Sequence, residues 1–500
     1  MSCPMCGSKG KRVCPSLNGG ICSSCCGLHR VSKINCPPDC AHNPFGPGQY
    51  DAFLAVERSF DAKAMECIMK HYGRNHVQEV VCSTMWQDED RDAQQAIVIG
   101  NAIYLLLFFR KDPQGKMLAD LWREAGCTGL TNDERIVLEA RSKASATVVE
   151  IQRVMDRQAM QCVDLLSPEK GVFIVLDRSS AARAIRFSTI MTWVDHYPAF
   201  SRFGAGGGVI PENVLDAFLD NLKKKAGREY GKPDFAAMKR YLSEHFGECI
   251  DGVGILARDW RKSMLQNMDF FQCIGTYRIC GDIRQILTVL EQKPEFEKDE
   301  EENDEKKYPG AKIYDWVRRG DSKVIENSMP FAFRHGGEDE GVGSLGILRL
   351  YQDRLEVEAF SKKKYAFAKK MTEKYFGKEV SFQREKIVDV AKQMAEHDPE
   401  EREDEEKKET KAGSGKLPPE IERKLLSQFH EKHYQKFLDS PVPALRGMTP
   451  RAASLDPASR PLLIDLMKGH VRNLEAQNKE RGLKLSLDSV LDELGLPELK

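Results

Sequence analysis

The sequence predicts a multidomain α+β protein that is predominantly helical and begins with a small cysteine-rich module. Three observations lead to this prediction. Eight of the 15 cysteines lie between Cys3 and Cys40. Apolar residues then recur every three or four positions over much of the chain, which is typical of amphipathic helices. Short β-rich runs interrupt this pattern in two places, and strands mixed with helices in this way indicate α+β layers.

The composition bounds the class of protein. A length of 500 residues favours about three domains, and 41% hydrophobic with 30% charged residues is typical of folded chains. With a formal net charge of −1, the chain as a whole has no positive electrostatic field that would attract nucleic acid. Any preference for nucleic acid must therefore come from a local basic surface. The longest apolar run, residues 96–109, is too short to span a bilayer, and a buried helix is expected there. Cysteines and charged residues replace the apolar stretch of a signal peptide, so we expect a cytoplasmic protein without membrane contact.

Breaks in the pattern divide the chain into six segments. A breaker at residues 43–48 ends the cysteine-rich module, and two highly charged stretches are typical of solvated linkers. Helices are expected up to Gln161, and a β unit from Cys162 to Ile210. The predicted segments are a module (1–48), a helical domain (49–161), a small β unit with helices (162–268), an α+β domain with an acidic insert at 295–307 (269–398), a charged linker (399–416) and a helical tail (417–500).

Within the α+β domain the predicted elements follow in a regular order. Strands are expected at residues 270–279 and 312–317, and helices at 282–290 and 362–376. A hairpin is expected from Ser344 to Phe360, turning at Gln352 and Asp353.

The spacing of the N-terminal cysteines predicts metal binding. Clustered pairs in a large chain favour a metal over disulfides, and zinc prefers four thiolate or imidazole ligands in a tetrahedron. Adjacent side chains usually diverge, so the neighbours Cys25 and Cys26 indicate two sites rather than one. The candidate ligands are Cys3, Cys6, Cys14, Cys22, Cys25, Cys26, His29, Cys36 and Cys40.

Nine candidates compete for the eight places of two zinc ions. An interleaved arrangement gives one ion Cys3, Cys6, Cys26 and His29, and gives the other Cys22, Cys25, Cys36 and Cys40. This arrangement leaves Cys14 over, and in the alternative His29 is the residue left over. A catalytic zinc needs an open position and usually a carboxylate base, and Asp39 is the only acid in the module. We therefore expect structural zinc, without which so small a segment has too little core to fold.

The module also carries a local excess of positive charge. A basic zinc module can bind phosphate, which makes nucleic acid one expected partner. Few aromatic residues are interleaved to stack on bases, so a protein-binding surface and a merely solvated face remain alternatives. The basic residues are Lys9, Lys11, Arg12, Arg30 and Lys33.

No motif in the sequence indicates catalysis. The glycine-rich stretch 204–208 lacks the Lys-Ser or Lys-Thr of a phosphate-binding loop and is expected to be a flexible turn. Asp195 and His196 are neighbours that rarely face each other, and no Gly-x-Ser-x-Gly elbow is present. His430 and His433 do not have the His-Glu-x-x-His spacing of a zinc hydrolase. A hydrolase with an unrecognised site is the remaining enzymatic alternative.

Two stretches carry a resemblance to known sequences. Residues 14–40 resemble the N-terminal module of uncharacterised bacterial proteins, in which the positions of six cysteines recur: Cys14, Cys22, Cys25, Cys26, Cys36 and Cys40. Residues 437–453, FLDSPVPALRGMTPRAA, are similar to a C-terminal segment of the same kind of protein. They are also similar to the toxin-binding segment of some bacterial antitoxins, with Phe437 in place of the usual Trp.

The second resemblance implies a docking corner in the tail. In physical terms this segment is a helix end, a proline-stiffened turn and a new helix capped by Thr449, which equally suits a plain structural corner. The residues that the resemblance implies for partner binding are Phe437, Pro443, Leu445, Thr449, Pro450 and Arg451. The leading hypothesis is thus a non-enzymatic bacterial zinc protein that binds another protein, and the alternative is a regulator that binds nucleic acid.

Overall fold

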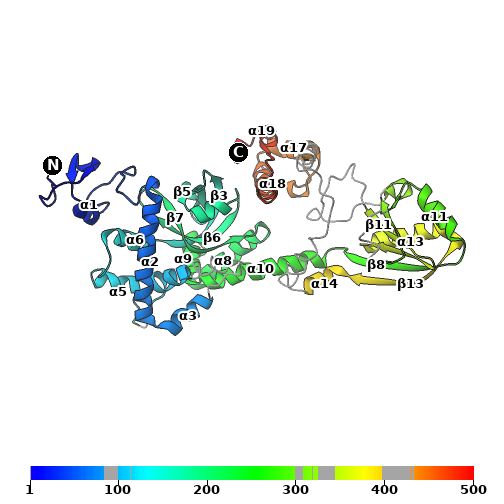
Figure 1. Cartoon of the computed structure of the whole chain (residues 1–500), viewed down its shortest axis with the longest axis horizontal. Helices are drawn as coiled ribbons and strands as arrows, with labels where there is room; N and C mark the ends of the chain where they lie inside the picture. The colour runs from blue at the N-terminus through cyan, green and yellow to red at the C-terminus, as the bar shows by residue number, and fades with distance from the viewer. Residues whose placement is uncertain are drawn as a thin grey trace. The chain divides into compact units, whose positions relative to one another are not determined.

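The computed structural model describes residues 2–83, 99–112, 114–298, 308–317, 319–324, 344–396, 430 and 433–500. It confirms a mixed α+β protein that is mostly helical (Figure 1). The chain forms two compact units: residues 1–257 together with 437–500, and residues 258–436. Each unit has its own core, and the two are described separately.

The first unit begins with the cysteine-rich module. Its antiparallel hairpin consists of β1 (Arg12–Cys14) and β2 (Gly19–Ile21), and the short helix α1 (Ser23–His29) follows. Strand alternation exposes 79% of Val13 and turns Cys14 inward, where 8% is exposed. The buried cluster of the module consists of four cysteines with only two aliphatic residues, Ile21 and Ile34. Hydrocarbon packing therefore contributes little to the stability of this module.

A helical layer follows the module. It contains α2 (Tyr50–Tyr72), α3 (Arg74–Ser83), α5 (Leu118–Glu124) and α6 (Asn132–Ser142). In α2 the buried residues recur at helical spacing and face one large core, as the sequence predicts. The apolar run predicted as a buried helix lies in this core from Ala102 to Phe108. Its first three residues, 96–98, lie outside the described part of the chain.

Glu134 fixes the start of α6 and makes stability depend on pH. Its carboxylate accepts hydrogen bonds from Ser59 Oγ at 2.6 Å, Lys63 Nζ at 2.7 Å and the Thr131 N–H at 2.7 Å. Burial raises the pKa of Glu134, but the hydrogen bonds from Lys63, Ser59 and Thr131 outweigh it and lower the pKa from 4.5 to about 2. An acid with a lowered folded-state pKa stabilises the protein above its unfolded pKa. That stability is lost as the pH falls from about 4.5 to about 2.

We expect Glu134→Gln to remove this acid dependence. The shift corresponds to roughly 3 kcal/mol of unfolding free energy at neutral pH. Urea unfolding of the wild type and the variant between pH 2 and 7 measures it. The matched control is Glu139→Gln, since the Glu139 side chain is on the same helix but 53% exposed. Parallel curves for the wild type and Glu134→Gln below pH 4.5 would contradict the assignment.

A closed five-stranded barrel forms the centre of the first unit. Its strand order is β3-β4-β5-β7-β6, in which β5 and β7 are parallel and the other neighbours antiparallel. The helix α7 (Arg178–Arg183) lies between the third and fourth strands and inserts Ala181 into the barrel core. This order and helix position are the topology of the OB-fold. The strands are β3 (Ser145–Val154), β4 (Ala159–Asp164), β5 (Val172–Leu176), β6 (Thr189–His196) and β7 (Ser201–Ile210).

The β unit thus begins earlier than the sequence predicts. Helix was expected up to Gln161, but β3 and the first half of β4 lie within that stretch. Residues 147–151 are rich in β-branched side chains, which prefer a pleated surface. Ala146 and Val148 belong to the helical core, whereas Val149 and Ile151 belong to the barrel core. A strand with apolar residues on both faces shows little of the alternation on which the prediction depended.

The helix α9 and the C-terminal tail contact the barrel. The helices α8 (Glu212–Tyr230), α9 (Phe235–Glu244) and α10 (Phe246–Gln266) follow it in sequence, and α9 packs on β3. The tail contains α17 (Pro450–Leu455), α18 (Arg460–Arg481) and α19 (Asp488–Glu493). Ion pairs join α18 to the barrel and to α8: Lys468 with Glu150 at 2.6 Å, Arg186 with Glu475, and Arg472 with Glu212.

The second unit is an antiparallel sheet with helices on one face. Its strand order is β13-β8-β12-β11-β10-β9, and α11 and α13 share a core with it. The predicted strands, the hairpin and both helices are confirmed. The elements are β8 (Phe271–Ile279), α11 (Ile283–Gln292), β9 (Phe296–Lys298), β10 (Lys312–Val317), β11 (Ser344–Leu350), β12 (Arg354–Ala359), α13 (Lys362–Phe376), β13 (Val380–Asp389) and α14 (Val390–Glu396).

Two details of this unit differ from the prediction. The acidic insert was expected to be a solvated linker from residue 295, but residues 296–298 form β9, because Phe296 is buried against Trp316. The strand β13 was not predicted, since most of its residues are exposed and polar. Residues 299–307 and the linker 399–416 lie outside the described part of the chain.

Candidate metal centre

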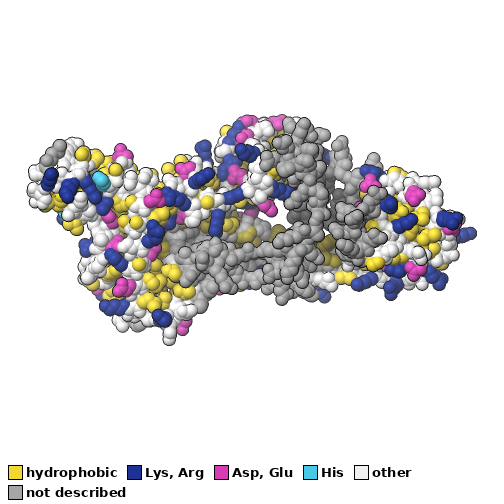
Figure 2. Space-filling view, in the orientation of Figure 1, with side chains coloured by type: hydrophobic (Ala, Val, Ile, Leu, Met, Phe, Trp, Pro, Cys, Tyr) yellow, Lys and Arg dark blue, Asp and Glu magenta, His cyan; other side chains and the backbone are white. Residues whose placement is uncertain are grey.

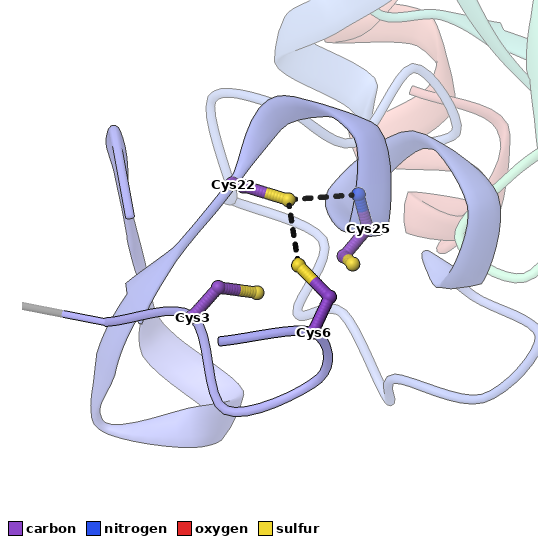
Figure 3. Close-up of side chains that lie close together, drawn as sticks. All are labelled: Cys3, Cys6, Cys22 and Cys25. Carbon is purple, nitrogen blue, oxygen red and sulfur yellow. Dashed lines mark hydrogen bonds between the residues drawn. The ribbon is translucent and has the colours of Figure 1, made fainter. Parts of the chain in front are cut away.

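Four cysteine thiols meet at the N-terminal module (Figure 3). The sulfur atoms of Cys3, Cys6, Cys22 and Cys25 all lie within 4.8 Å of one another. The sulfurs of Cys6 and Cys22 are 3.6 Å apart. A zinc–sulfur bond of about 2.3 Å in a tetrahedron places sulfurs about 3.8 Å apart, so this cluster fits one zinc ion.

The start of α1 positions two of these ligands. Cys22 is the N-cap residue, and its sulfur accepts a hydrogen bond from the Cys25 N–H at 3.3 Å. The Cys-x2-Cys turn at Cys3 and Cys6 faces this helix start, as Figure 3 shows. Backbone N–H donors at a helix N-terminus favour thiolate over thiol.

The thiols of the cluster shift one another's pKa values. Hydrogen bonds from Ser8 lower the pKa of Cys6 to about 6, with smaller contributions from Cys25 and Cys22. Hydrogen bonding to Cys6 and Cys22 raises the pKa of Cys25. Thiols this close repel one another when all are ionised, so the last proton stays unless a cation replaces it.

The ligand set favours a structural over a catalytic metal. All four ligands are thiols, which would fill a zinc tetrahedron and leave no open position for water or substrate. The acid of the module, Asp39, is exposed and does not belong to the cluster. A four-cysteine ligand set of this kind is typical of structural zinc sites.

The predicted pairing of the ligands is wrong. Cys26 and His29 were expected to complete the site of Cys3 and Cys6, but Cys22 and Cys25 do so. Cys22 and Cys25 span one turn at the N-terminus of α1 and therefore point to the same ion. Cys26 comes one residue later, which turns its side chain by about 100° around the helix axis.

The other predicted ligands lie elsewhere in the module. Cys14 and Cys26 are buried in its core together with Cys3 and Cys25, and Cys36 packs against this core. Cys40 is half-buried. His29 is the last residue of α1. The prediction of a second ion therefore depends on the cysteines outside the first cluster.

The basic residues divide into two groups. The Arg30 side chain forms an ion pair with Asp133 at 3.0 Å and donates to the His42 carbonyl at 2.5 Å, so it anchors the module to α6. Lys9, Lys11 and Lys33 are exposed, and Arg12 is half-exposed. Figure 2 shows dark blue side chains on this module. Nucleic-acid binding by these residues stays a prediction.

The predicted docking corner of the tail is largely built into the fold of the tail. Leu445 is fully buried, Pro450 is buried, and the Thr449 side chain caps α17 by accepting from the Ala452 N–H at 3.2 Å. Arg451 pairs with Asp439 and Glu493, and the Phe437 ring lies 4.9 Å from the His470 ring. Of the six implied residues, Pro443 is exposed. The docking of a partner at this corner stays a prediction.

The structure also places two further candidates from the sequence, the Asp195–His196 pair and the glycine-rich stretch 204–208. Asp195 is fully buried and accepts a hydrogen bond from Tyr104 at 2.5 Å, whereas His196 is exposed beside Ser201. They therefore do not form a catalytic pair. The stretch 204–208 lies inside β7, so the expected flexible turn is wrong. An ideal Cβ on Gly204 would lie 2.5 Å from Tyr104 Oη, which explains the glycine there.

Sequence reasoning missed an exposed apolar face on the barrel. Its side chains are Met155, Val172 and Ile174, of which 48%, 57% and 43% is exposed. Residues 172–176 are five consecutive apolar residues, a pattern that predicts a buried strand. The sequence carries no signal that alternate side chains of this strand face solvent.

Comparisons with protein-family models, with curated proteins and with solved structures give no match to this chain. Among the described helices, none has the length and apolar character required to cross a bilayer.

Proposed function

We propose that this chain is a non-enzymatic zinc protein that contacts another protein through the open face of its barrel. The observation that carries the proposal is the apolar outer surface of β4 and β5. Val172 and Ile174 of β5 project outward, where they pair in register with Val163 and Gln161 of β4. Met155, in the loop between β3 and β4, extends this surface. Exposed apolar clusters of this kind are typical of interaction sites.

The topology favours the same face. OB-folds bind their ligands on the second and third strands and on the loop between the first two strands. In this barrel these parts are β4, β5 and the loop that carries Met155. A fold alone does not establish a function, so the side chains on the face must identify the ligand.

The chemistry of the face favours protein over single-stranded nucleic acid. Nucleic-acid sites of this fold stack bases on aromatic rings and attract phosphates with basic residues. In β4 and β5, both fully described, Phe173 is the single aromatic residue, and it packs against the barrel core. Only Val175 of β5 pairs with β7, so Val172 to Ile174 pair with β4 alone among the described strands. An extended partner segment could add to this edge by backbone hydrogen bonds.

The zinc module contributes a rigid attachment in this proposal. Asn132 Nδ2 donates to the Arg30 carbonyl at 3.1 Å, and Ser32 donates to Asn132 at 2.8 Å. With the Arg30–Asp133 ion pair, these bonds join the metal-stabilised loop to the start of α6. Zinc therefore supports the fold and takes no part in a reaction.

The double variant Val172→Asp/Ile174→Asp tests the proposal. We expect it to weaken binding of the partner protein, identified by cross-linking to the wild type, by more than about tenfold, because buried anchors dominate protein interfaces. The matched control is Val209→Asp, since Val209 of β7 is 58% exposed in the same barrel. Titration of labelled single-stranded DNA and RNA at low salt tests the alternative. Unchanged partner binding, or nucleic-acid binding that requires Lys9, Lys11 and Lys33, would refute the proposal.

A further inference from the structure

One histidine far from the cysteine-rich module lies among carboxylates. The His245 Nε2 atom is 3.2 Å from a carboxylate oxygen of Glu229. The ligand atoms of Glu229, Glu244 and His245 all lie within 4.8 Å of one another. Metal bonds to oxygen and nitrogen of about 2.1 Å in a tetrahedron place the ligand atoms about 3.4 Å apart. The three side chains are therefore close enough to share one ion.

The end of α9 explains how two neighbouring side chains can converge. Glu244 is the last residue of α9, and His245 follows it as the C-cap residue with φ −122° and ψ 36°, outside helical geometry. The turn of about 100° between consecutive helical residues therefore does not separate the two side chains. Glu229 comes from the last turn of α8, which packs against α9. The three ligands thus join two helices.

Both glutamates lie where a helix least favours an acid. Glu229 and Glu244 stand in the last turns of α8 and α9. The free carbonyl groups of a helix C-terminus carry a partial negative charge, which repels carboxylates and attracts cations. Arg240 Nε contacts Glu244 at 3.0 Å, but within the described part of the chain no lysine or arginine pairs with Glu229. A bound cation would offset the remaining negative charge.

The surroundings of His245 orient its ring as in metal sites. A metal-bound histidine usually donates its other ring N–H to a carboxylate. Here Nε2 faces Glu229, and Nδ1 lies 3.6 Å from Glu248 Oε2. Glu248 accepts a hydrogen bond from the Tyr241 hydroxyl at 2.9 Å, and the Tyr241 ring stacks on the His245 ring with the centroids 4.3 Å apart. The imidazole is thus held with Nε2 on the side of the carboxylate ligands.

We propose that Glu229, Glu244 and His245 form a site for a divalent transition-metal cation, for which zinc is the best fit. Zinc accepts imidazole and carboxylate ligands together, whereas magnesium and calcium prefer oxygen alone. Three protein ligands leave a fourth position for water, so this ion is exchangeable, unlike one enclosed by four cysteines. The site goes beyond the proposed function, since it involves neither the barrel face nor the zinc module. A bound ion would fix the ends of α8 and α9, and α9 packs on β3.

Cobalt binding to the full-length protein, loaded with zinc and then dialysed, tests the inference. Thiolate-bound zinc stays in place, because zinc binds such sites more tightly than cobalt does. We expect one further equivalent of Co²⁺ to bind with the d–d absorption of nitrogen and oxygen ligands and without a thiolate charge-transfer band. Glu229→Gln and His245→Ala should each weaken binding by more than about tenfold, and Glu248→Gln by about tenfold, because carboxylates beside a ligand also tune affinity.

The matched control is His76→Ala, which should leave cobalt binding unchanged. His76 Nδ1 lies 3.6 Å from Glu79 Oε2, and no third ligand joins this pair among the described residues. Absence of cobalt binding in the wild type would overturn the site. Binding that survives both Glu229→Gln and His245→Ala would assign the cobalt to other surface groups, and a charge-transfer band would assign it to cysteines. Because the Glu229 side chain is 39% exposed and glutamine has the same shape, loss of binding in Glu229→Gln would not reflect misfolding. None of these outcomes alters the test of the barrel face.

Discussion

Removal of zinc is expected to unfold residues 2–40 while the barrel and its helices stay folded. The module buries only Ile21 and Ile34 besides cysteines, so without metal it has almost no hydrocarbon core. Structural zinc supplies on the order of 10–16 kcal/mol in peptides of this size, and that binding energy is folding energy. Hydrogen exchange followed by mass spectrometry, before and after chelation, measures the loss of protection residue by residue.

Trypsin provides an independent readout of the same event. Lys9, Lys11 and Lys33 are exposed but lie in an ordered module, so cleavage there should accelerate after chelation. Adding zinc back should restore the wild-type pattern, and Cys67→Ser should behave as the wild type. Exchange in β3 to β7 serves as the internal control and should change little. Unchanged protection of residues 2–40 in metal-free protein would show that the module folds without zinc.

The cysteine spacing predicted the presence of a metal site but not its ligand pairing. The pairs Cys22–Cys25 and Cys26–His29 have the same spacing in sequence, so the spacing does not show which pair joins Cys3 and Cys6. The helix α1 decides between them, since its N-cap geometry points Cys22 and Cys25 to one side. That geometry depends on where the helix begins, and the sequence does not mark Cys22 as a usual N-cap residue.

The second unit was predicted in more detail than the barrel for a physical reason. Its strands and helices are bounded by strong local signals, such as the side-chain caps at Asp282 and Ser361. The barrel closes through a parallel pair, Val175 with Ser201, which are separated by a helix and a strand. Such pairings depend on tertiary packing, which no local pattern records.

The sequence also did not predict the buried ionic network that joins α2, α6 and the barrel. Glu57, Arg141 and Arg202 are charged residues in mostly amphipathic or alternating stretches, where charges normally face solvent. In the structure Arg202 of β7 forms an ion pair with Glu57 of α2 at 2.9 Å. Only the three-dimensional arrangement shows that opposite charges from distant segments meet there.

Arg141→Met is expected to cost roughly 3–5 kcal/mol of unfolding free energy, because it leaves buried carboxylates without their cation. Arg141 is 4% exposed. Its guanidinium contacts Asp61, Glu57 at 3.1 Å and Asp195 at 3.6 Å, which belong to α2 and β6. One side chain therefore joins α6 to both neighbours. Urea unfolding at pH 7 measures the loss.

The control and the pH dependence distinguish this mechanism from lost packing. Arg123→Met removes exposed pairs with Asp120 and Glu139 and should cost at most about 1 kcal/mol. Burial raises the pKa of Asp195 to about 6, although Arg141 acts to lower it. Without Arg141 that pKa rises further, and a buried acid with a raised pKa loses stability as the pH rises towards it. The deficit of Arg141→Met should therefore be larger at pH 8 than at pH 5, whereas a deficit that is equal at both would assign the cost to packing.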